Sequence, residues 1–208
     1  MMIEYLLFAV AAYCLGSIPT AVWVGKVRYG IDVREHGSKN AGATNTFRVL
    51  GKKPGIIVLA IDISKGFSAV FLPFLVGMGD YGSEELINLQ LVCALCAVVG
   101  HVLPVFAGFR GGKGVATSLG VIIGIHPPAA AICLGIFLIV FISSNFVSLG
   151  AMMAACSFPV ILVTLFGVRS PWLIAFSIVL SAAVIYAHKK NIGRLLRGEE
   201  NKMNLFKK

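Results

Sequence analysis

Long apolar segments separated by short charged ones constrain the fold of this chain more than any other sequence feature. Hydrophobic residues make up 58% of its 208 residues, and charged residues only 13%. A soluble domain carries roughly a quarter charged residues, and a small one keeps too much surface to bury this many apolar side chains. We therefore expect an all-α, polytopic membrane protein. The composition excludes a soluble globular protein, a disordered chain and a nucleic-acid-binding domain.

A spanning helix needs about 20 apolar residues, so a chain of this length has room for about seven spans with short connections. The predicted spans cover residues 5–24, 55–76, 86–106, 115–125, 129–142, 147–166 and 172–187. They leave no room for a soluble domain, so we treat 1–208 as a single integral-membrane domain. The segment 115–125 crosses only about half of the hydrocarbon core at about 1.5 Å per residue. It and its successor can also be read as one re-entrant element, which leaves five spans.

Basic residues indicate how the predicted bundle is oriented. The segments 26–53, 108–114 and 188–208 hold 7, 2 and 7 of the 18 Lys and Arg residues. The positive-inside rule places all three in the cytoplasm, which requires an outside N-terminus, a cytoplasmic C-terminus and an odd number of spans. The net charge of +9 also suits contact with anionic lipid headgroups and with anionic substrates.

The first polar cluster is the segment 37–45, here called the serine loop, with Arg48 three residues beyond it. Small residues alternate in this loop with hydroxyl and amide side chains, and the candidate donors are Ser38, Asn40, Thr44 and Asn45. A loop of this kind can bring backbone N–H groups close to an anion. A flexible basic loop lying on anionic lipid explains the composition equally well.

The second cluster is the segment 110–114, here called the glycine loop, which precedes a predicted helix. Gly111, Gly112 and Gly114 surround Lys113. Consecutive glycines let backbone N–H groups form a concave anion site, and a helix N-terminus adds positive potential. A tight turn between two spans needs one or two glycines and no lysine among them. We therefore favour phosphate binding for this loop.

The third cluster follows the last predicted span and runs from His188 to Glu200. If that span continues as a helix, His188, Asn191 and Arg194 recur every three residues and share one face. An imidazole, an amide and a guanidinium on one face suit a phosphate or a polyol phosphate. The alternative is an ordinary basic tail beside the membrane.

Weaker signals lie inside or at the ends of the predicted spans. Asp62 and Lys65 are three residues apart and can pair on one helix face. His101, at the end of the third span, is either a base or a helix-end hydrogen-bonding group. Ser148 begins the sixth span, where serine is common. The histidines lack the spacing of a metal site, so we predict no metal.

At these motifs the chain resembles the membrane-integral bacterial glycerol-3-phosphate acyltransferases that use acyl-phosphate as donor (the PlsY family). The matching stretches are 16–19, 37–45, 62–66, 100–106, 111–117 and 188–200, in the order that the family has. The resemblance implies a seven-helix bundle in the bacterial cytoplasmic (inner) membrane, with an outside N-terminus and a cytoplasmic active site. It also implies transfer of a fatty acyl group from acyl-phosphate to the sn-1 hydroxyl of glycerol 3-phosphate. The products are lysophosphatidic acid and phosphate, in the first acylation of phospholipid synthesis, without a cofactor, metal or acyl carrier protein.

The resemblance also assigns roles to residues by motif match. It implies catalytic roles for Ser38, Arg48, Lys113 and His188. It implies substrate-binding roles for Asn40, Thr44, Asn45, His101, Gly111, Gly112, Gly114, Ser148 and Asn191, with Glu200 bracing the site. One departure is Lys189, where the family usually has Arg, which keeps the charge and loses the bidentate fork. The proton acceptor stays open between a donor phosphate oxygen, His188 and His101. A small transporter for an anionic solute is the competing class, but the nearly apolar midplane of the spans disfavours it.

Overall fold

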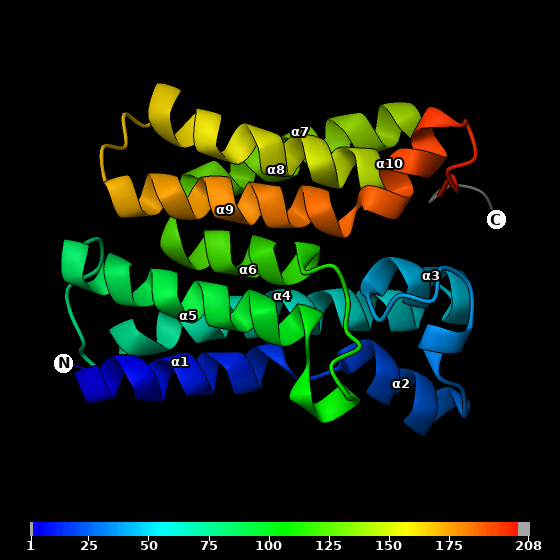
Figure 1. Cartoon of the computed structure of the whole chain (residues 1–208), viewed down its shortest axis with the longest axis horizontal. Helices are drawn as coiled ribbons and strands as arrows, with labels where there is room; N and C mark the ends of the chain where they lie inside the picture. Colours follow the sequence, from blue (N-terminus) through cyan, green and yellow to red (C-terminus); the bar gives the residue numbers. More distant parts are fainter. Residues whose placement is uncertain (1, 204–208) are drawn as a thin grey trace. The chain divides into compact units, whose positions relative to one another are not determined.

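The computed structural model describes residues 2–203, and this part of the chain consists of helices and connections without a strand. The chain divides into two compact units, Met1–His126 and Pro127–Lys208, which are described separately below. Unit 1 contains α1 (Met2–Gly16), α2 (Thr20–Tyr29), η1 (Val33–Glu35), α3 (Ala43–Leu50), α4 (Lys52–Leu75), α5 (Glu84–Val102), η2 (Val105–Ala107) and α6 (Val115–Ile125). Unit 2 contains α7 (Pro127–Ser144), α8 (Val147–Thr164), α9 (Pro171–Ala187) and α10 (Lys189–Leu196). Figure 1 labels these helices.

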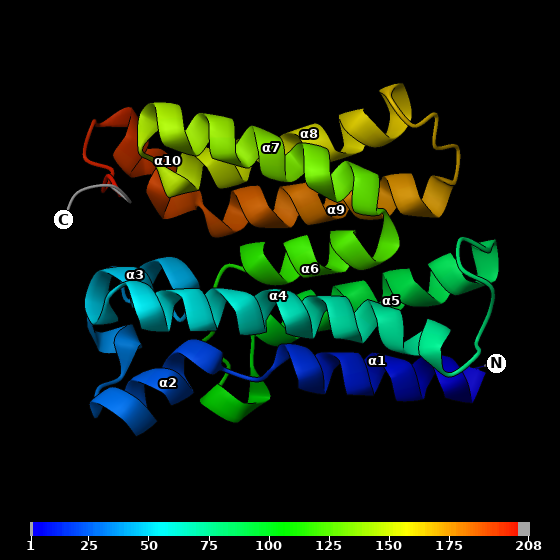
Figure 2. The same cartoon turned by 180° about the vertical axis from the view of Figure 1, so that it is seen from behind.

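Unit 1 is built on two closely packed helix pairs. Helix α4 packs along α6, and α1 packs along α5, as the views in Figures 1 and 2 both show. A Cβ atom at Gly66 would overlap the carbonyl oxygen of Thr117, and one at Gly120 would overlap that of Ile63. The backbones of α4 and α6 therefore approach each other as closely as small residues allow. This contact holds the short α6, and with it the loop at its N-terminus, against a long helix.

Unit 2 is a three-helix layer in which α8 packs against both α7 and α9. The hydroxyl of Ser181 on α9 donates a hydrogen bond to the carbonyl oxygen of Ala155 on α8. The chain bends by 59° between α9 and α10, and His188 is the residue at the bend. The last span therefore does not continue as one straight helix, which was the condition for His188, Asn191 and Arg194 to share one face. The bend turns α10 away from the axis of α9.

The helices of both units have the length and composition of membrane-spanning segments. Five spans qualify among the described residues, and the bent pair α9 and α10 makes a sixth. Their outward side chains include exposed apolar residues such as Leu6, Ile56, Ile139 and Ile178. The predicted all-helical membrane fold is thus confirmed in its class. Helix α6, with 11 residues, has the predicted bounds 115–125 and is shorter than a full span.

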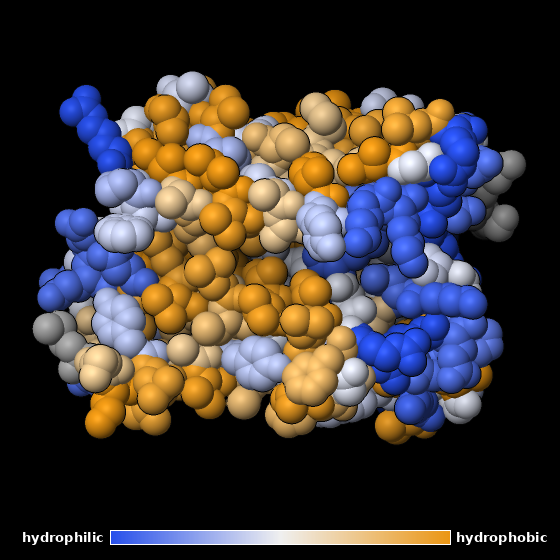
Figure 3. Space-filling view, in the orientation of Figure 1, coloured by the Kyte–Doolittle hydropathy of each residue, from blue (hydrophilic) through white to orange (hydrophobic). Residues whose placement is uncertain are grey.

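Surface hydropathy separates the middle of each unit from its ends. In unit 1 the face seen in Figure 3 is apolar along α1 and α5, and hydrophilic residues gather over α2 and α3. In unit 2 hydrophilic residues gather over α10. Two predicted boundaries differ from the structure. The first span is two helices that break at residues 17–19, and the polar segment 26–53 contains the helices η1 and α3.

Candidate active site

The serine loop of unit 1 is folded around the side chain of Asn45, which is 1% exposed. The Asn45 Oδ1 atom accepts a hydrogen bond from the backbone N–H of Ser38 at 2.8 Å. The Asn45 Nδ2 atom donates to the carbonyl oxygens of Val33 at 2.7 Å and of His36 at 3.1 Å. Both amide hydrogens are used within the protein. Asn45 therefore braces the loop through its amide group.

The other predicted residues of the first cluster lie on the loop or on α3. Ser38 is exposed, and Asn40 is half-buried. Thr44 lies in the first turn of α3 and Arg48 in its last, and both are half-buried. Residues four apart on a helix are neighbours on its surface. The structure thus presents a hydroxyl and a guanidinium on one face of α3, directly after the loop that carries Ser38.

The glycine loop, residues 110–114, is tied to the end of α5 through its own backbone. The N–H of Gly111 donates to the carbonyl oxygen of Val102 at 3.2 Å, and that of Gly112 donates to the carbonyl oxygen of His101 at 3.1 Å. A Cβ atom at Gly112 would overlap Nε2 of the His101 ring. The loop therefore rests directly on the imidazole, and only glycine fits at this position.

The same loop leads into the N-terminus of α6. Gly114 precedes the helix with φ +80°, and Lys113 is half-buried just before it. The first N–H groups of a helix have no acceptor within the helix and carry its positive end. The hydroxyls of Thr117 and Ser118 in the first turns are buried and have no hydrogen-bond partner among the described residues. Lys113 and the first N–H groups of α6 therefore form a positive group of donors of the kind that suits an anion.

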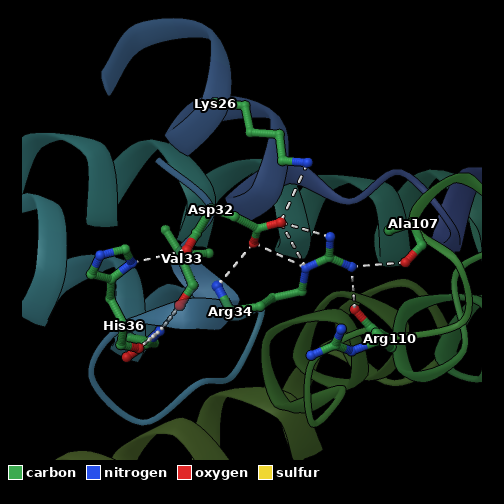
Figure 4. A network of polar contacts seen from close by, with 8 residues as sticks. Lys26, Asp32, Val33, Arg34, His36, Ala107 and Arg110 are labelled. Atoms are coloured by element: carbon green, nitrogen blue, oxygen red, sulfur yellow. Dashed lines mark hydrogen bonds and ion pairs between the residues drawn. The ribbon is translucent and has the colours of Figure 1, made fainter. Parts of the chain in front are cut away.

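A charged network links the chain before the serine loop to the chain before the glycine loop (Figure 4). The carboxylate of Asp32 accepts hydrogen bonds from Arg34 Nε and Nη2, and Lys26 Nζ lies 3.4 Å from Asp32 Oδ2. The Arg34 Nη1 atom donates to the carbonyl oxygens of Ala107 and Arg110. Hydrogen bonds from the Arg34 side chain hold the pKa of Asp32 well below its usual range. Both side chains are therefore charged at any physiological pH.

A second charged cluster is buried inside unit 1 and lines a pocket together with residues of both loops. Lys65 Nζ lies 2.9 Å from Asp62 Oδ1, so these two residues pair as their spacing allows. Lys65 Nζ also donates to the carbonyl oxygen of Ile18 at 2.9 Å, and the hydroxyl of Thr20 donates to Asp62 Oδ1 at 3.1 Å. His101 Nδ1 lies 3.8 Å from the same carboxylate oxygen. Buried charges need such partners, because an isolated charge in this environment is costly.

This cluster opens on a small pocket with a volume of about 10 Å³, which is room for about one water molecule. Its lining comes from the helix break, from both loops and from the charged cluster, and consists of Ile18, Pro19, Thr20, Ala41, Asp62, Lys65, His101, Pro104 and Gly111. Asp62 Oδ2 and His101 Nδ1 are buried and have no hydrogen-bond partner among the described residues. His101 Nδ1 lies 3.8 Å from the other carboxylate oxygen, Oδ1, which is too far for a direct hydrogen bond.

The third cluster, in unit 2, is built around the carboxylate of Glu200. Glu200 Oε1 accepts hydrogen bonds from the Ser148 hydroxyl at 2.9 Å and from Asn191 Nδ2 at 2.7 Å. Its Oε2 atom accepts a hydrogen bond from Arg194 Nε at 2.6 Å. The side chains of Glu200, Ser148 and Asn191 are buried. The structure thus brings together residues from α8, from α10 and from the chain after α10, with Glu200 as their common partner.

Two opposing effects set the charge of Glu200. Burial by itself raises the pKa of this carboxyl group, whereas the hydrogen bonds from Arg194, Asn191 and Ser148 and the positive charge of Arg194 lower it. The second set is stronger, so the pKa of Glu200 lies below its usual value. Glu200 is therefore ionised at neutral pH, which is the state that its three donors require.

His188, at the bend between α9 and α10, is 3% exposed. Its Nδ1 atom lies 2.8 Å from the carbonyl oxygen of Val184. A carbonyl oxygen can only accept, so Nδ1 carries a hydrogen. In the neutral ring Nε2 is then the atom with the lone pair. The bend thus fixes both the orientation and the tautomer of the ring.

Sequence reasoning did not single out Asp32, Arg34 or Thr20 as parts of the site. Asp32 and Arg34 counted only as charges of the basic segment 26–53. A carboxylate two residues before an arginine is too common a spacing to predict a network. Thr20 lies inside the predicted first span, and nothing in its own surroundings points to Asp62, which is 42 residues away.

Comparison with known proteins places the chain in a family. A family model described as glycerol-3-phosphate acyltransferase matches residues 6–198. The chain belongs to the glycerol-3-phosphate acyltransferase family. Curated members include one from Chlorobaculum tepidum, which is 41% identical and matches 100% of both chains. A second, from Bacillus cereus and named glycerol-3-phosphate acyltransferase 2, is 45% identical over 100% of this chain and 99% of its own.

Solved structures of the family match the fold. One is PlsY (YgiH), described as an integral membrane glycerol 3-phosphate acyltransferase, in its glycerol 3-phosphate form. It has a TM-score of 0.86 and 35% sequence identity, and the match covers 98% of this chain and 100% of that one. The lysophosphatidic acid form of the same protein matches with a TM-score of 0.83 over 97% of this chain. The suspected family is therefore confirmed.

Proposed function

We propose that this protein transfers a fatty acyl group from acyl-phosphate to the sn-1 hydroxyl of glycerol 3-phosphate, with lysophosphatidic acid and inorganic phosphate as products. The observation that carries this proposal is the glycine loop, which places Lys113 beside the first N–H groups of α6. Such a group of donors suits a phosphate that gains charge as it leaves. Membership of the glycerol-3-phosphate acyltransferase family supports the acceptor substrate.

In the proposed reaction, the chain binds two phosphates and brings their reacting groups together. The glycine loop and Lys113 hold one phosphate, and Ser38, Asn40, Thr44 and Arg48 hold or orient phosphate at the serine loop. The His101 ring packs against Gly112 and supports the glycine loop there. Two anions repel each other, so the positive groups lower the cost of placing them side by side. Holding the reactants in one geometry supplies much of the rate enhancement.

The covalent step follows from the chemistry of the mixed anhydride. The hydroxyl oxygen of glycerol 3-phosphate attacks the acyl carbonyl carbon, and the bond between that carbon and the phosphate oxygen breaks. Phosphate leaves with the bonding electrons and takes up the hydroxyl proton. This leaving group is already good, so no protein base is required. His188, whose neutral ring carries its lone pair on Nε2, can orient the attacking hydroxyl by accepting its hydrogen bond.

Glu200 prepares the side chains that hold glycerol 3-phosphate. Because its carboxylate engages Ser148, Asn191 and Arg194, these groups are fixed before substrate arrives. Preorganised donors cost less entropy on binding. Asn45, which donates its amide hydrogens to the carbonyl oxygens of Val33 and His36, stabilises the serine loop.

We also propose that the chain crosses the bacterial cytoplasmic membrane seven times as a single domain, with an outside N-terminus and a cytoplasmic active site. The five or six qualifying spans, together with the apolar helix α6, support this number. The basic segments 26–53, 108–114 and 188–208 support the orientation. Cysteine labelling from either side of sealed vesicles, with single cysteines introduced in these segments, tests it.

The reaction is tested with purified protein, glycerol 3-phosphate and a long-chain acyl-phosphate, with acyl-CoA in a parallel reaction. Equal formation of phosphate and lysophosphatidic acid from acyl-phosphate alone is the expected result. Lys113→Ala should abolish turnover while the protein stays folded. Lys53→Ala, which removes an exposed lysine of α4 in the same unit, is the matched control. Near-normal turnover by Lys113→Ala, or no product from folded wild-type protein, contradicts the proposal.

A further inference from the structure

Hydrogen bonds on either side of the peptide link Val33–Arg34 join the serine loop to the glycine loop within unit 1. The connection starts at the backbone N–H of Ser38, which donates to Asn45 Oδ1, and continues from Asn45 Nδ2 to the carbonyl oxygen of Val33. Val33 begins the single turn η1, and the next residue is Arg34. The Arg34 guanidinium completes the connection by donating to the carbonyl oxygen of Arg110, directly before Gly111. Figure 4 shows the part around η1 and Arg34.

The orientation of the Arg34 side chain is fixed by Asp32. Arg34 Nε lies 3.0 Å from Asp32 Oδ1, and Nη2 lies 2.7 Å from Oδ2, which is a bidentate pair. The backbone N–H of Arg34 donates to Asp32 Oδ1 as well, and this bond caps η1. The two side chains are 14% and 10% exposed. With the Nε–Nη2 edge of the guanidinium held in this way, Nη1 is aimed at the neighbouring loop.

The target of Nη1 is the turn that leads into the glycine loop. Nη1 donates to the carbonyl oxygen of Ala107 at 2.8 Å and to that of Arg110 at 3.4 Å. Between them, Phe109 has φ +59°, a left-handed conformation that a bulky residue adopts only when its surroundings impose it. The N–H groups of the loop are tied to α5 on one side, so Arg34 supplies the anchor on the other.

We propose that Arg34, held by Asp32, is a positioning residue that sets the spacing between the serine loop and the glycine loop. The proposal rests on the proposed function, in which these loops hold the two phosphates. Arg34 touches neither substrate in this role and acts only through the carbonyl oxygens of the glycine loop. Lysine cannot replace it, because a lysine ammonium lacks the planar fork that binds a carboxylate and two carbonyl groups together.

The expected kinetic signature follows from this geometry. Each loop keeps its own donors when Arg34 is lost, so each substrate still binds. The reacting atoms are no longer held at the correct separation, and a displacement of about 1 Å costs up to about 100-fold in rate. Loss of Arg34 should therefore lower kcat and leave both KM values nearly unchanged. A residue that only stabilises the fold would lower the yield of folded enzyme and leave its kcat unchanged.

The first test compares Arg34→Lys and Arg34→Gln with Arg28→Gln, which removes an exposed arginine of α2 in the same unit. We expect kcat to fall about 10- to 100-fold in both Arg34 variants, with KM values within about threefold of wild type. The control should behave as wild type. Hydrogen exchange should show faster exchange of the amides of residues 107–112 in Arg34→Gln. Unchanged kcat in the folded variants, or a rise in KM with kcat unchanged, overturns the proposal.

A second test asks whether Asp32 acts through Arg34. If it does, Asp32→Asn lowers kcat, and the double variant Asp32→Asn with Arg34→Gln is no worse than Arg34→Gln alone. Multiplicative losses in the double variant overturn this part of the proposal.

The wild-type reaction distinguishes failure of the proposed function from failure of the positioning role. If wild type forms no product, the proposed function fails, and the exchange measurement still shows whether Arg34 anchors the loop. If wild type and Arg34→Gln turn over equally, only the positioning role fails.

Discussion

The glycine loop of unit 1 and the Glu200 cluster of unit 2, both part of the proposed substrate-binding residues, are built in different ways. The glycine loop places one lysine beside the first N–H groups of α6, and its shape depends on residues without side chains. The Glu200 cluster offers side chains, and its shape depends on one buried carboxylate that binds three donors. We therefore expect the glycine loop to be disrupted by an added side-chain atom, and the Glu200 cluster to be disrupted by removal of the Glu200 charge.

The largest expected effect comes from adding one methyl group to the glycine loop. In Gly112→Ala the new Cβ overlaps His101 Nε2, so the loop must move away from α5. A shift of about 1 Å at donors that stabilise the leaving phosphate should lower kcat by about 100-fold or more. Steady-state kinetics on folded protein checks this. Gly135→Ala in α7 is the control, because a Cβ there meets no atom within 4 Å. Full activity of Gly112→Ala would show that the loop does not need its close contact with His101.

Removal of one charge from the Glu200 cluster should have the next largest effect. In Glu200→Gln the side-chain NH₂ group faces the donor of either Arg194 or Asn191, because a carboxamide has only one oxygen. We expect turnover to fall about 10-fold and the free energy of unfolding to fall by about 1–3 kcal/mol. Chemical denaturation and kinetics, measured together, test this. Glu199→Gln, which alters the exposed neighbouring carboxylate, is the matched control. Equal behaviour of the two variants would remove Glu200 from the site.

Two serine variants sharpen the comparison between the regions. Ser38 is exposed and Ser148 donates to Glu200, so Ser38→Ala should lower activity with little change in stability. Ser148→Ala removes a buried hydrogen bond and should lower the free energy of unfolding by about 1 kcal/mol. Melting temperatures and initial rates of the two proteins give the four values needed. A stability loss in Ser38→Ala but not in Ser148→Ala would contradict the prediction that Ser148, and not Ser38, contributes to stability.

The smallest expected effect is a dependence of stability on pH in the acid range. The pKa values of Glu200 and Asp32 are lowered in the folded protein. Each group therefore stabilises the fold fully above the ordinary carboxyl pKa of about 4, and this contribution is lost as the pH falls through the folded-state value. The melting temperature should fall on acidification below that range. In Glu200→Gln the fall should be smaller by about 2–4 °C for each kcal/mol removed. An identical pH profile for both proteins would show that Glu200 is not stabilised as an anion.

Much of the fold could be predicted from the sequence because its elements are local. Apolar segment length gave the main helices, including the short α6, and the Asp62–Lys65 spacing allowed the pair that the structure shows. The bend at His188 could not be predicted, since no proline or glycine marks it. The break after Gly16 was missed because the apolar run continues through it, although Gly16 and Pro19 are local signals for a helix end.

The site was predictable in its residues and less so in their partners. Glycines around a lysine indicate an anion site because the reason is local, in the backbone itself. The partners of Asn45 and of Arg34 come from segments up to 76 residues away, and sequence patterns carry no distance information of that kind. The sequence therefore indicates that Asn45 carries a hydrogen-bonding amide, but it does not indicate the hydrogen bonds of that amide to Val33 and His36.

The pairing of Asp62 with Lys65 within one helix has a consequence for how the protein is made. During synthesis α4 reaches the membrane before α5 and α6 exist. A lone charge in such a segment would be costly to insert into the bilayer until a later helix supplied a partner. Because both charges lie on α4 three residues apart, the segment can enter the bilayer as a neutral unit. Insertion of this helix is thereby independent of the order in which the rest of the bundle assembles.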